Sequence, residues 1–188
     1  DSTKAFTGQV TVLTLLALAV GQLRGMVDAE TVKQVATALK AMPKIIKETL
    51  KCDPEVQNIS RMFTYAHNFL YLGRGYNYPT ALEGALKLKE ISYLHSEAYA
   101  AGELKHGTIA LIEENRLVIA VACYEPLFDK TMSNVKEVKA RGARVLGVAL
   151  EGNRAIYSEA DDVILVPRMD DLFVVPAEIV PLQLFAYY

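Results

Sequence analysis

Ionisable side chains are concentrated among apolar ones at residues 73–107, in the segment GRGYNYPTALEGALKLKEISYLHSEAYAAGELKHG. Glu83, Lys87 and Glu90 are spaced so that a helix would bring them within a stripe about 60° wide. His106 closes the segment in a short polar stretch bounded by glycines, which favours a functional over a structural histidine. A carboxylate and a histidine beside a cleft can transfer protons, so these residues indicate acid–base chemistry.

The helix expected at residues 78–94 allows two interpretations of its charged stripe. In most helices a Glu–Lys pair four residues apart is a solvated ion pair. Here the rest of the circumference is apolar or small, apart from Lys89, and such a helix is usually buried. Charges on a buried helix must be paired or must line a cleft, so both interpretations stay open from the residues alone.

Other motifs carry less chemistry. The turn Gly73-Arg74-Gly75 could present backbone N–H groups to an anion, but it lacks the third glycine of a dinucleotide-binding fingerprint. A purely structural turn is the simpler interpretation. The three histidines and two cysteines do not have the spacing of metal ligands, so we expect no metal site and no cofactor.

The composition excludes several classes of protein. A chain of 188 residues with 52% hydrophobic and 22% charged residues suits one globular domain with an appendage. Its net charge of −2 and isoelectric point near 6.0 give no electrostatic case for nucleic acid or an anionic membrane as partner. Two distant cysteines form no disulfide framework, so a reducing, cytoplasmic compartment is expected.

The opening part of the chain is predicted to be helical. The apolar run Val10–Val20 is 11 residues long, short of the ~20 that span a bilayer, and is interpreted as part of a buried helix ending near Leu23. A second helix is expected at about residues 29–50, where Pro43 should end or kink it. Asp53-Pro54 has the form of a third helix start.

Strands alternate with helices in the remainder. Short apolar runs predict buried strands, and periodic segments predict helices. The expected strands are 69–73, 117–123, 144–150 and 163–166, and the expected helices are 78–94, 129–141 and 173–188. This order predicts an α/β fold: a three-layer sandwich with a doubly wound parallel sheet, preceded by helices. In such folds the ligand is expected at the carboxyl ends of the strands.

The segment LGRGYNYPTALEGALKLKEISYLHSEAYAAGELKHG closely resembles the second sugar-isomerase (SIS) subdomain of the glutamine–fructose-6-phosphate aminotransferase family. The opening STKAFTGQVTVL resembles the helix that follows the family's first SIS subdomain, and VPLQLFAYY resembles its last long helix. The resemblance covers nearly the whole chain and rests on long motifs. It implies a flavodoxin-like or Rossmann-like SIS fold, with residues 1–52 as a helical segment linking two SIS subdomains and residues 53–188 as one of them.

The resemblance also implies roles for individual residues. Glu90 matches the family's base, which moves a proton between C1 and C2 and turns a fructosimine into an aldose; partial burial is expected to raise its pKa. His106 matches the acid–base residue of ring opening, which reaches the site of the neighbouring subunit. Lys87 matches the lysine beside the sugar, Glu83 is expected to orient Lys87, and Ser2 matches a sugar-contacting serine.

The implied reaction makes glucosamine 6-phosphate from fructose 6-phosphate and glutamine-derived ammonia. The implied partners are the sugar phosphate, a second copy in a homodimer, and a glutaminase domain of the same polypeptide. The family's glutaminase domain, its phosphate-holding loop and its imine-forming lysine are not in this sequence. We therefore expect little or no synthase activity from these residues alone. A smaller departure is Thr108, where the family usually has proline.

Two alternatives remain beside this interpretation. One is a non-catalytic phosphosugar-binding SIS module of the kind found in regulators, although neither a helix-turn-helix nor a basic region accompanies it here. The other is a related deglycase or ketose–aldose isomerase that acts on another amino sugar. The presence of both Glu90 and His106 favours an enzyme over a binding module.

Overall fold

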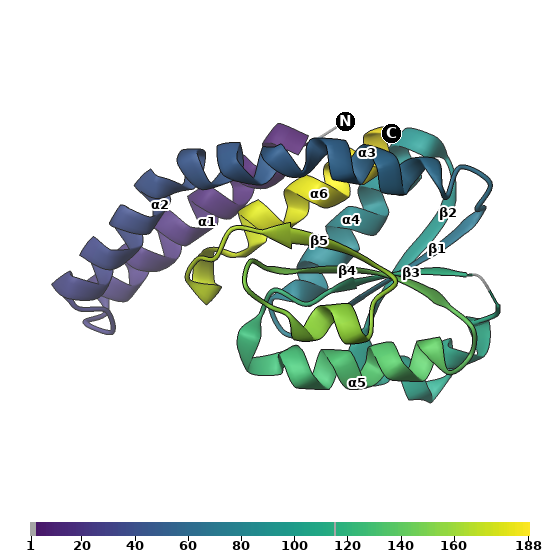
Figure 1. Ribbon diagram of the computed structural model, residues 1–188. Coiled ribbons are helices and arrows are strands. Elements are labelled where there is room, and N and C mark those ends of the chain that lie inside the picture. Colours follow the sequence, from purple (N-terminus) through teal and green to yellow (C-terminus); the bar gives the residue numbers. More distant parts are fainter. Residues whose placement is uncertain (1–2, 115) are drawn as a thin grey trace.

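Five parallel strands form the central sheet of the protein (Figure 1). The structure is a computed structural model that describes residues 3–114 and 116–188. In the order β2-β1-β3-β4-β5, every neighbouring pair is parallel. The strand bounds are β1 (Asn68–Gly73), β2 (His95–Ala100), β3 (Leu117–Val121), β4 (Arg144–Leu150) and β5 (Asp162–Val166). The chain reverses its direction of winding at β1, so the predicted doubly wound α/β sandwich is confirmed.

Helices cover both faces of this sheet. On one face lie α3 (Asp53–Arg61), α4 (Asn77–Ser92) and α6 (Val175–Tyr187); on the other lies α5 (Phe128–Lys139). Short 3₁₀ helices complete the connections: η1 (Leu50–Cys52), η2 (Ala101–His106), η3 (Thr108–Leu111), η4 (Glu125–Leu127), η5 (Ala155–Ser158) and η6 (Asp171–Phe173).

The central strand β3 shows why the sheet is buried on both sides. All five of its residues are apolar and buried. Successive side chains of a strand point to opposite faces, so Ile119 joins the core beneath α4 and α6 whereas Val118 joins the core beneath α5. A continuous apolar run was therefore the right signal for a strand in this position.

The edge strand β2 was missed from the sequence, which had predicted four strands. Its residues HSEAYA are mostly polar or small, and only Ser96 is fully buried. Ser96 Oγ donates a hydrogen bond of 2.5 Å to the backbone oxygen of Ala85 on α4. Most of the residues of β2 are only partly buried, so it does not need the continuous apolar run by which the other strands were recognised.

A helical hairpin of α1 (Thr3–Leu23) and α2 (Ala29–Thr49) extends from the body of the protein (Figure 1). The predicted burial of Val10–Val20 is wrong: among residues 3–23 none is buried, and Leu13 is 63% exposed. Within the described chain α1 lies beside α2 and α6 only on one side, which leaves its other side uncovered. The second helix is confirmed as α2, and it continues through Pro43 to Thr49, so Pro43 does not end it.

By length and composition alone α1 could cross a membrane, but an apolar helix that packs on another part of a protein passes the same test.

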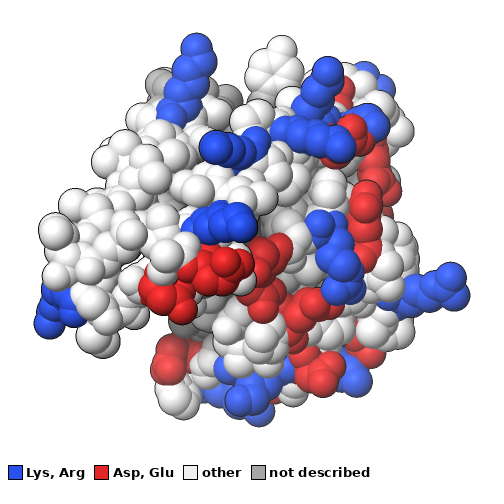
Figure 2. All heavy atoms as spheres, turned by 90° about the vertical axis from the view of Figure 1, so that its left-hand side faces the viewer, with Lys and Arg blue, Asp and Glu red and all other residues white. Residues whose placement is uncertain are grey.

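Figure 2 views the molecule from the end that carries the hairpin. Blue and red groups alternate there between wide uncharged areas. The described residues of this face therefore form no continuous basic surface of the kind that binds nucleic acid.

Candidate functional site

The charged stripe on α4 forms a paired cluster inside the protein. Lys87 is fully buried, and its Nζ donates a hydrogen bond of 2.7 Å to Oε2 of Glu90. The same Nζ lies 3.5 Å from Oε1 of Glu83, whose side chain is 12% exposed. The side chain of Glu90 is 45% exposed. The structure therefore brings together the three residues that the helical spacing had singled out, and it excludes the interpretation as a solvated surface pair.

The three pKa values follow from this arrangement. Burial opposes the charge on Lys87, but the hydrogen bond to Glu90 and the charge of Glu83 outweigh it and raise the pKa of the ammonium. Burial raises the pKa of Glu83, which Lys87 only partly offsets. The hydrogen bond from Lys87 lowers the pKa of Glu90. The expected upward shift for Glu90 is thus wrong, because pairing with a buried cation outweighs its partial burial.

The half-exposed carboxylate of Glu90 is ionised and is held on one side. Its Oε2 accepts the hydrogen bond from the buried Lys87, and the side chain is open to solvent at 45% exposure. An ionised carboxylate fixed by a buried lysine can accept a proton from a molecule that approaches from solvent. The arrangement thus places on a helix a carboxylate that can act as a general base.

His106 lies on the other side of the sheet. It ends η2, its side chain is 73% exposed, and its Nδ1 lies 2.8 Å from Oε2 of Glu103. The same short helix packs beneath α5, where Leu104 is buried and Lys105 Nζ lies 3.0 Å from Glu137 Oε1. Because α4 covers the opposite face, the structure does not bring His106 and the α4 cluster together within one chain.

Ser2 lies outside the described residues. The helix that follows it starts at Thr3, and Phe6 packs against the core cluster that contains Ala85 and Leu88 of α4. The first turns of α1 are therefore close to the helix layer that carries the charged stripe.

A buried carboxyl that the sequence did not single out lies at the carboxyl ends of the strands. Glu178 of α6 is 0% exposed; Asn77 Nδ2 donates to its Oε2 at 2.6 Å, and Thr80 donates to its Oε1. Burial raises the pKa of Glu178 to about 7, although the bonds from Thr80 and Asn77 favour its charged form. A single carboxylate in the apolar run VVPAEIVPLQLF was the signal for it.

Part of the carboxyl edge of the sheet, where the ligand was expected, thus holds a structural network at the ends of β1 and β3. Oδ1 of Asn77 accepts a hydrogen bond of 2.8 Å from the backbone N–H of Tyr124, beyond the end of β3. In the neighbouring turn Arg74 Nε donates to Asn134 Oδ1 at 2.9 Å, which agrees with a structural role for this turn. The charged stripe instead runs along α4, which starts at this edge and carries Glu90 towards the opposite one.

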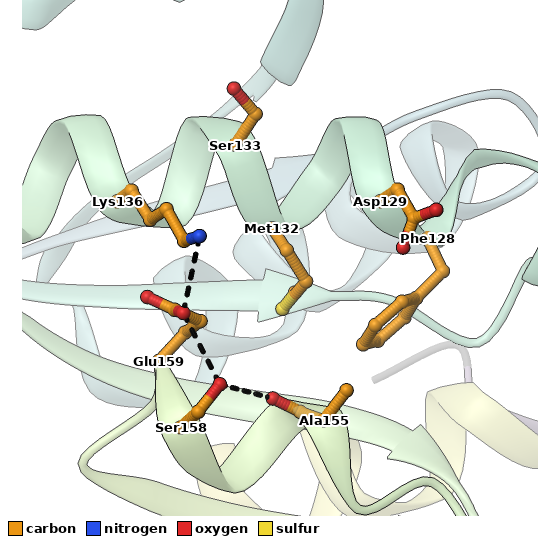
Figure 3. A pocket seen from close by; sticks show the side chains of 8 residues that line it. All are labelled: Phe128, Asp129, Met132, Ser133, Lys136, Ala155, Ser158 and Glu159. Atoms are coloured by element: carbon orange, nitrogen blue, oxygen red, sulfur yellow. Dashed lines mark hydrogen bonds and ion pairs between the residues drawn. The ribbon is translucent and has the colours of Figure 1, made fainter.

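A hollow of about 380 Å³ lies between α5 and η5, apart from the charged stripe on α4 (Figure 3). Part of its polar lining is paired: Lys136 Nζ lies 3.4 Å from Glu159 Oε1, and Ser158 Oγ donates to the backbone oxygen of Ala155 at 2.8 Å. These paired groups offer little to a ligand. In the described parts of the chain no group of three or more His, Cys, Asp or Glu residues could hold a metal ion.

Comparison with known proteins assigns the fold. The family model "SIS domain" matches residues 62–188. The chain belongs to the SIS domain family. This SIS chain is 48% identical, over its whole length, to glutamine–fructose-6-phosphate aminotransferase (isomerizing) of Bacteroides thetaiotaomicron, and 45% identical over 99% of its length to that of Thermus thermophilus. It spans 30% and 31% of the length of these relatives.

Solved structures agree with the sequences. The C-terminal domain of glucosamine-fructose-6-phosphate aminotransferase from Francisella tularensis matches all of this SIS chain with a TM-score of 0.92 and 38% identity, and 53% of that chain is covered. Glucosamine-6-phosphate deaminase from Thermotoga maritima, with 23% identity and a TM-score of 0.63, shares the fold. The resemblance to the aminotransferase family is therefore confirmed for its C-terminal SIS region.

Proposed function

We propose that this chain is the second SIS subdomain, with its preceding helices, of a glutamine–fructose-6-phosphate aminotransferase. In that enzyme Glu90 would transfer the proton that converts the fructosimine into glucosamine 6-phosphate. The observation that carries the proposal is the pair of Lys87 and Glu90, within a chain that is 45–48% identical to such aminotransferases. This pair supplies an ionised, half-exposed carboxylate at a fixed position.

The proposed step is an intramolecular proton transfer. Glu90 takes a proton from C1 of the fructosimine, and the electrons of that C–H bond form a C1–C2 double bond as the imine nitrogen gains its electron pair. The same carboxyl returns the proton to C2. The nitrogen takes up one proton as the C1 hydroxyl loses one, which leaves an amine at C2 and an aldehyde at C1 with no net change in protons. One carboxylate can do both because the two carbons are neighbours on one face of the substrate.

Lys87 and Glu83 have supporting roles in this proposal. The buried ammonium of Lys87 binds Glu90 Oε2 and lowers the pKa of Glu90, so the base is ionised and its free oxygen has one orientation. Glu83 lies 3.5 Å from the ammonium on its other side and compensates its charge. The two carboxylates thus offset the free-energy cost of burying the charge of Lys87. The lysine in turn orients the base, Glu90.

His106 is proposed to act in a second copy of the chain. It is exposed and lies across the sheet from Glu90, so a partner subunit could receive it without rearrangement of the core. This supports the expectation of a homodimer in which ring opening of fructose 6-phosphate uses a histidine from the neighbouring protomer. The glutaminase domain of the same polypeptide would supply ammonia.

The test uses the full-length protein that contains this chain. Glu90→Gln should abolish formation of glucosamine 6-phosphate and leave glutamine hydrolysis at the parent rate. Glu48→Gln on α2 is a matched control, since Glu48 also pairs with a lysine three residues away but on the surface. Product formation at the parent rate by Glu90→Gln would remove the role given to Glu90.

A further inference from the structure

A hollow of about 530 Å³ lies between the start of α1, α2 and α6. Its lining includes Thr3, Lys4, Thr7, Val180 and Gln183. Ligand pockets commonly enclose roughly 300–1,000 Å³, so the hollow is large enough for a small molecule. It contains hydroxyl, ammonium and amide groups on otherwise apolar walls, a combination that suits a polar ligand with carbon–hydrogen faces.

Two buried polar atoms on the helices beside this hollow make no hydrogen bond with the described residues: Nε2 of Gln183, which lines the hollow, and Oε1 of Glu83 on α4. The Glu83 oxygen has only the ion pair with Lys87 Nζ at 3.5 Å, so it can still accept a hydrogen bond. A buried polar atom without a hydrogen bond costs free energy, and a folded protein usually retains few of them. A hydroxyl group that reached both atoms would accept from the amide of Gln183 and donate to Glu83.

The packing of α4 against α6 places these two residues on the same side. The helices run parallel: Thr80 contacts Glu178, and one turn later Gly84 faces Leu182, so close that a Cβ on Gly84 would lie 2.6 Å from Leu182 Cδ1. Gln183, one residue after Leu182, is therefore level with the turn between Glu83 and Lys87.

The helical repeat then sets the direction of each side chain. At about 100° per residue, Glu83 and Gln183 leave their helices on the side opposite to Ala85 and Phe185. The latter two belong to the core cluster between the helices and the sheet. Glu83 and Gln183 thus lie on the outer side of the helix pair, and Gln183 lines the hollow together with Thr3, Lys4 and Thr7 of α1.

We propose that Gln183 is a further substrate-binding residue, whose Nε2 donates to a hydroxyl oxygen of the bound sugar phosphate while Glu83 Oε1 accepts the proton of that hydroxyl. The inference rests on the proposed function for its substrate class. A phosphate in this position would be repelled by Glu83, and an apolar group would leave both atoms unsatisfied. A sugar hydroxyl is the group that matches them.

The test measures binding of glucosamine 6-phosphate to the full-length protein by titration calorimetry. Gln183→Met keeps the length of the side chain and removes the donor, so the dissociation constant should rise about tenfold. The midpoint of thermal unfolding without sugar should stay unchanged or rise, because a buried unpaired amide is lost. Gln57→Met on α3, a partly exposed glutamine outside the hollow, should leave both quantities unchanged.

The outcomes separate this inference from the proposed function. An unchanged dissociation constant in Gln183→Met overturns the role of Gln183, with or without a change in the unfolding midpoint. This conclusion does not depend on whether Glu90→Gln forms product. If Gln183→Met weakens binding but Glu90→Gln still forms product, the sugar contact stands and the proton transfer by Glu90 fails. Gln183→Leu, which also lacks the donor, keeps the test decisive if the methionine variant does not fold. It should weaken binding in the same way.

Discussion

The side-chain amide of Asn77 and the carboxyl of Glu178 lie 2.6 Å apart in the interior, and their hydrogen bond joins the first turn of α4 to the first turn of α6. Asn77 also accepts the backbone N–H of Tyr124, so the end of β3 is fixed to the same point. The orientation of α4, and of the charged stripe on it, therefore depends on a carboxyl group at the opposite end of the helix.

The first prediction concerns the pH dependence of stability. The pKa of Glu178 is raised by burial from 4.5 to about 7 in the folded protein. Between these values the folded state retains a proton that the unfolded chain releases, so the free energy of unfolding should fall as pH rises from about 4.5 to 7. The total change should be about 3 kcal/mol. Urea unfolding of this domain at several pH values measures it.

Glu178→Gln should remove most of that slope, because the amide does not titrate and can accept from Asn77 while it donates to the hydroxyl of Thr80. Glu103→Gln, at an exposed carboxylate, is the control and should retain the slope of the parent protein. If Glu178→Gln kept the parental slope, another group would be responsible for the pH dependence.

The charged residues of α4 and the buried Glu178 show which parts of the site can be predicted from the sequence. Glu83, Lys87 and Glu90 were found because the helical repeat fixes their relative directions whatever the helix packs against. Glu178 was missed because its partners Asn77 and Thr80 are 101 and 98 positions away, and only the tertiary fold brings them together. An isolated carboxylate in an apolar helix indicates a buried partner without identifying it.

The same distinction explains the errors on whole elements. Apolar runs predicted β1, β3, β4 and also the edge strand β5, because most residues of these strands are buried. The edge strand β2 has no such run, and α1 has one without being covered in the described chain. Hydrophobicity alone thus predicts the tendency to be buried, whereas the covering surface depends on what else is packed nearby.

A second prediction tests how Lys87 affects the base. In the full-length protein Lys87→Met removes the hydrogen bond that lowers the pKa of Glu90, so that pKa should rise. Because the base must be ionised, the acid limb of the pH profile of kcat/KM should move to higher pH. Activity on the acid side should fall on the order of tenfold or more.

Lys51→Met is the control for that experiment, since it removes the lysine of the surface pair with Glu48. Its pH profile should match that of the parent protein. An unshifted acid limb in Lys87→Met would show that the ammonium does not set the ionisation of the base.

A third prediction compares two glycines in helices. A Cβ on Gly84 would lie 2.6 Å from Leu182 Cδ1 and 3.1 Å from Tyr71 Cε1, whereas a Cβ on Gly8 would meet nothing within 4 Å. Alanine has the better helix propensity by about 1 kcal/mol, but overpacking of a core commonly costs about 1–3 kcal/mol. Gly8→Ala should therefore raise the unfolding midpoint and Gly84→Ala should lower it. Equal effects of the two variants would contradict close packing of α4 on α6.

The last prediction tests whether His106 serves the site of a second subunit. A full-length Glu90→Gln protein and a full-length His106→Asn protein should each be inactive in sugar isomerisation. If each site combines Glu90 of one protomer with His106 of the other, one of the two sites in a mixed dimer retains both residues. Random mixing should then restore about a quarter of the parental activity.

If both residues served a site within one chain, every site in every dimer would lack one of them, and mixing would restore nothing. Separate purification tags on the two variants allow the mixed dimer to be isolated and assayed directly. The position of His106 across the sheet from Glu90 favours recovery of activity.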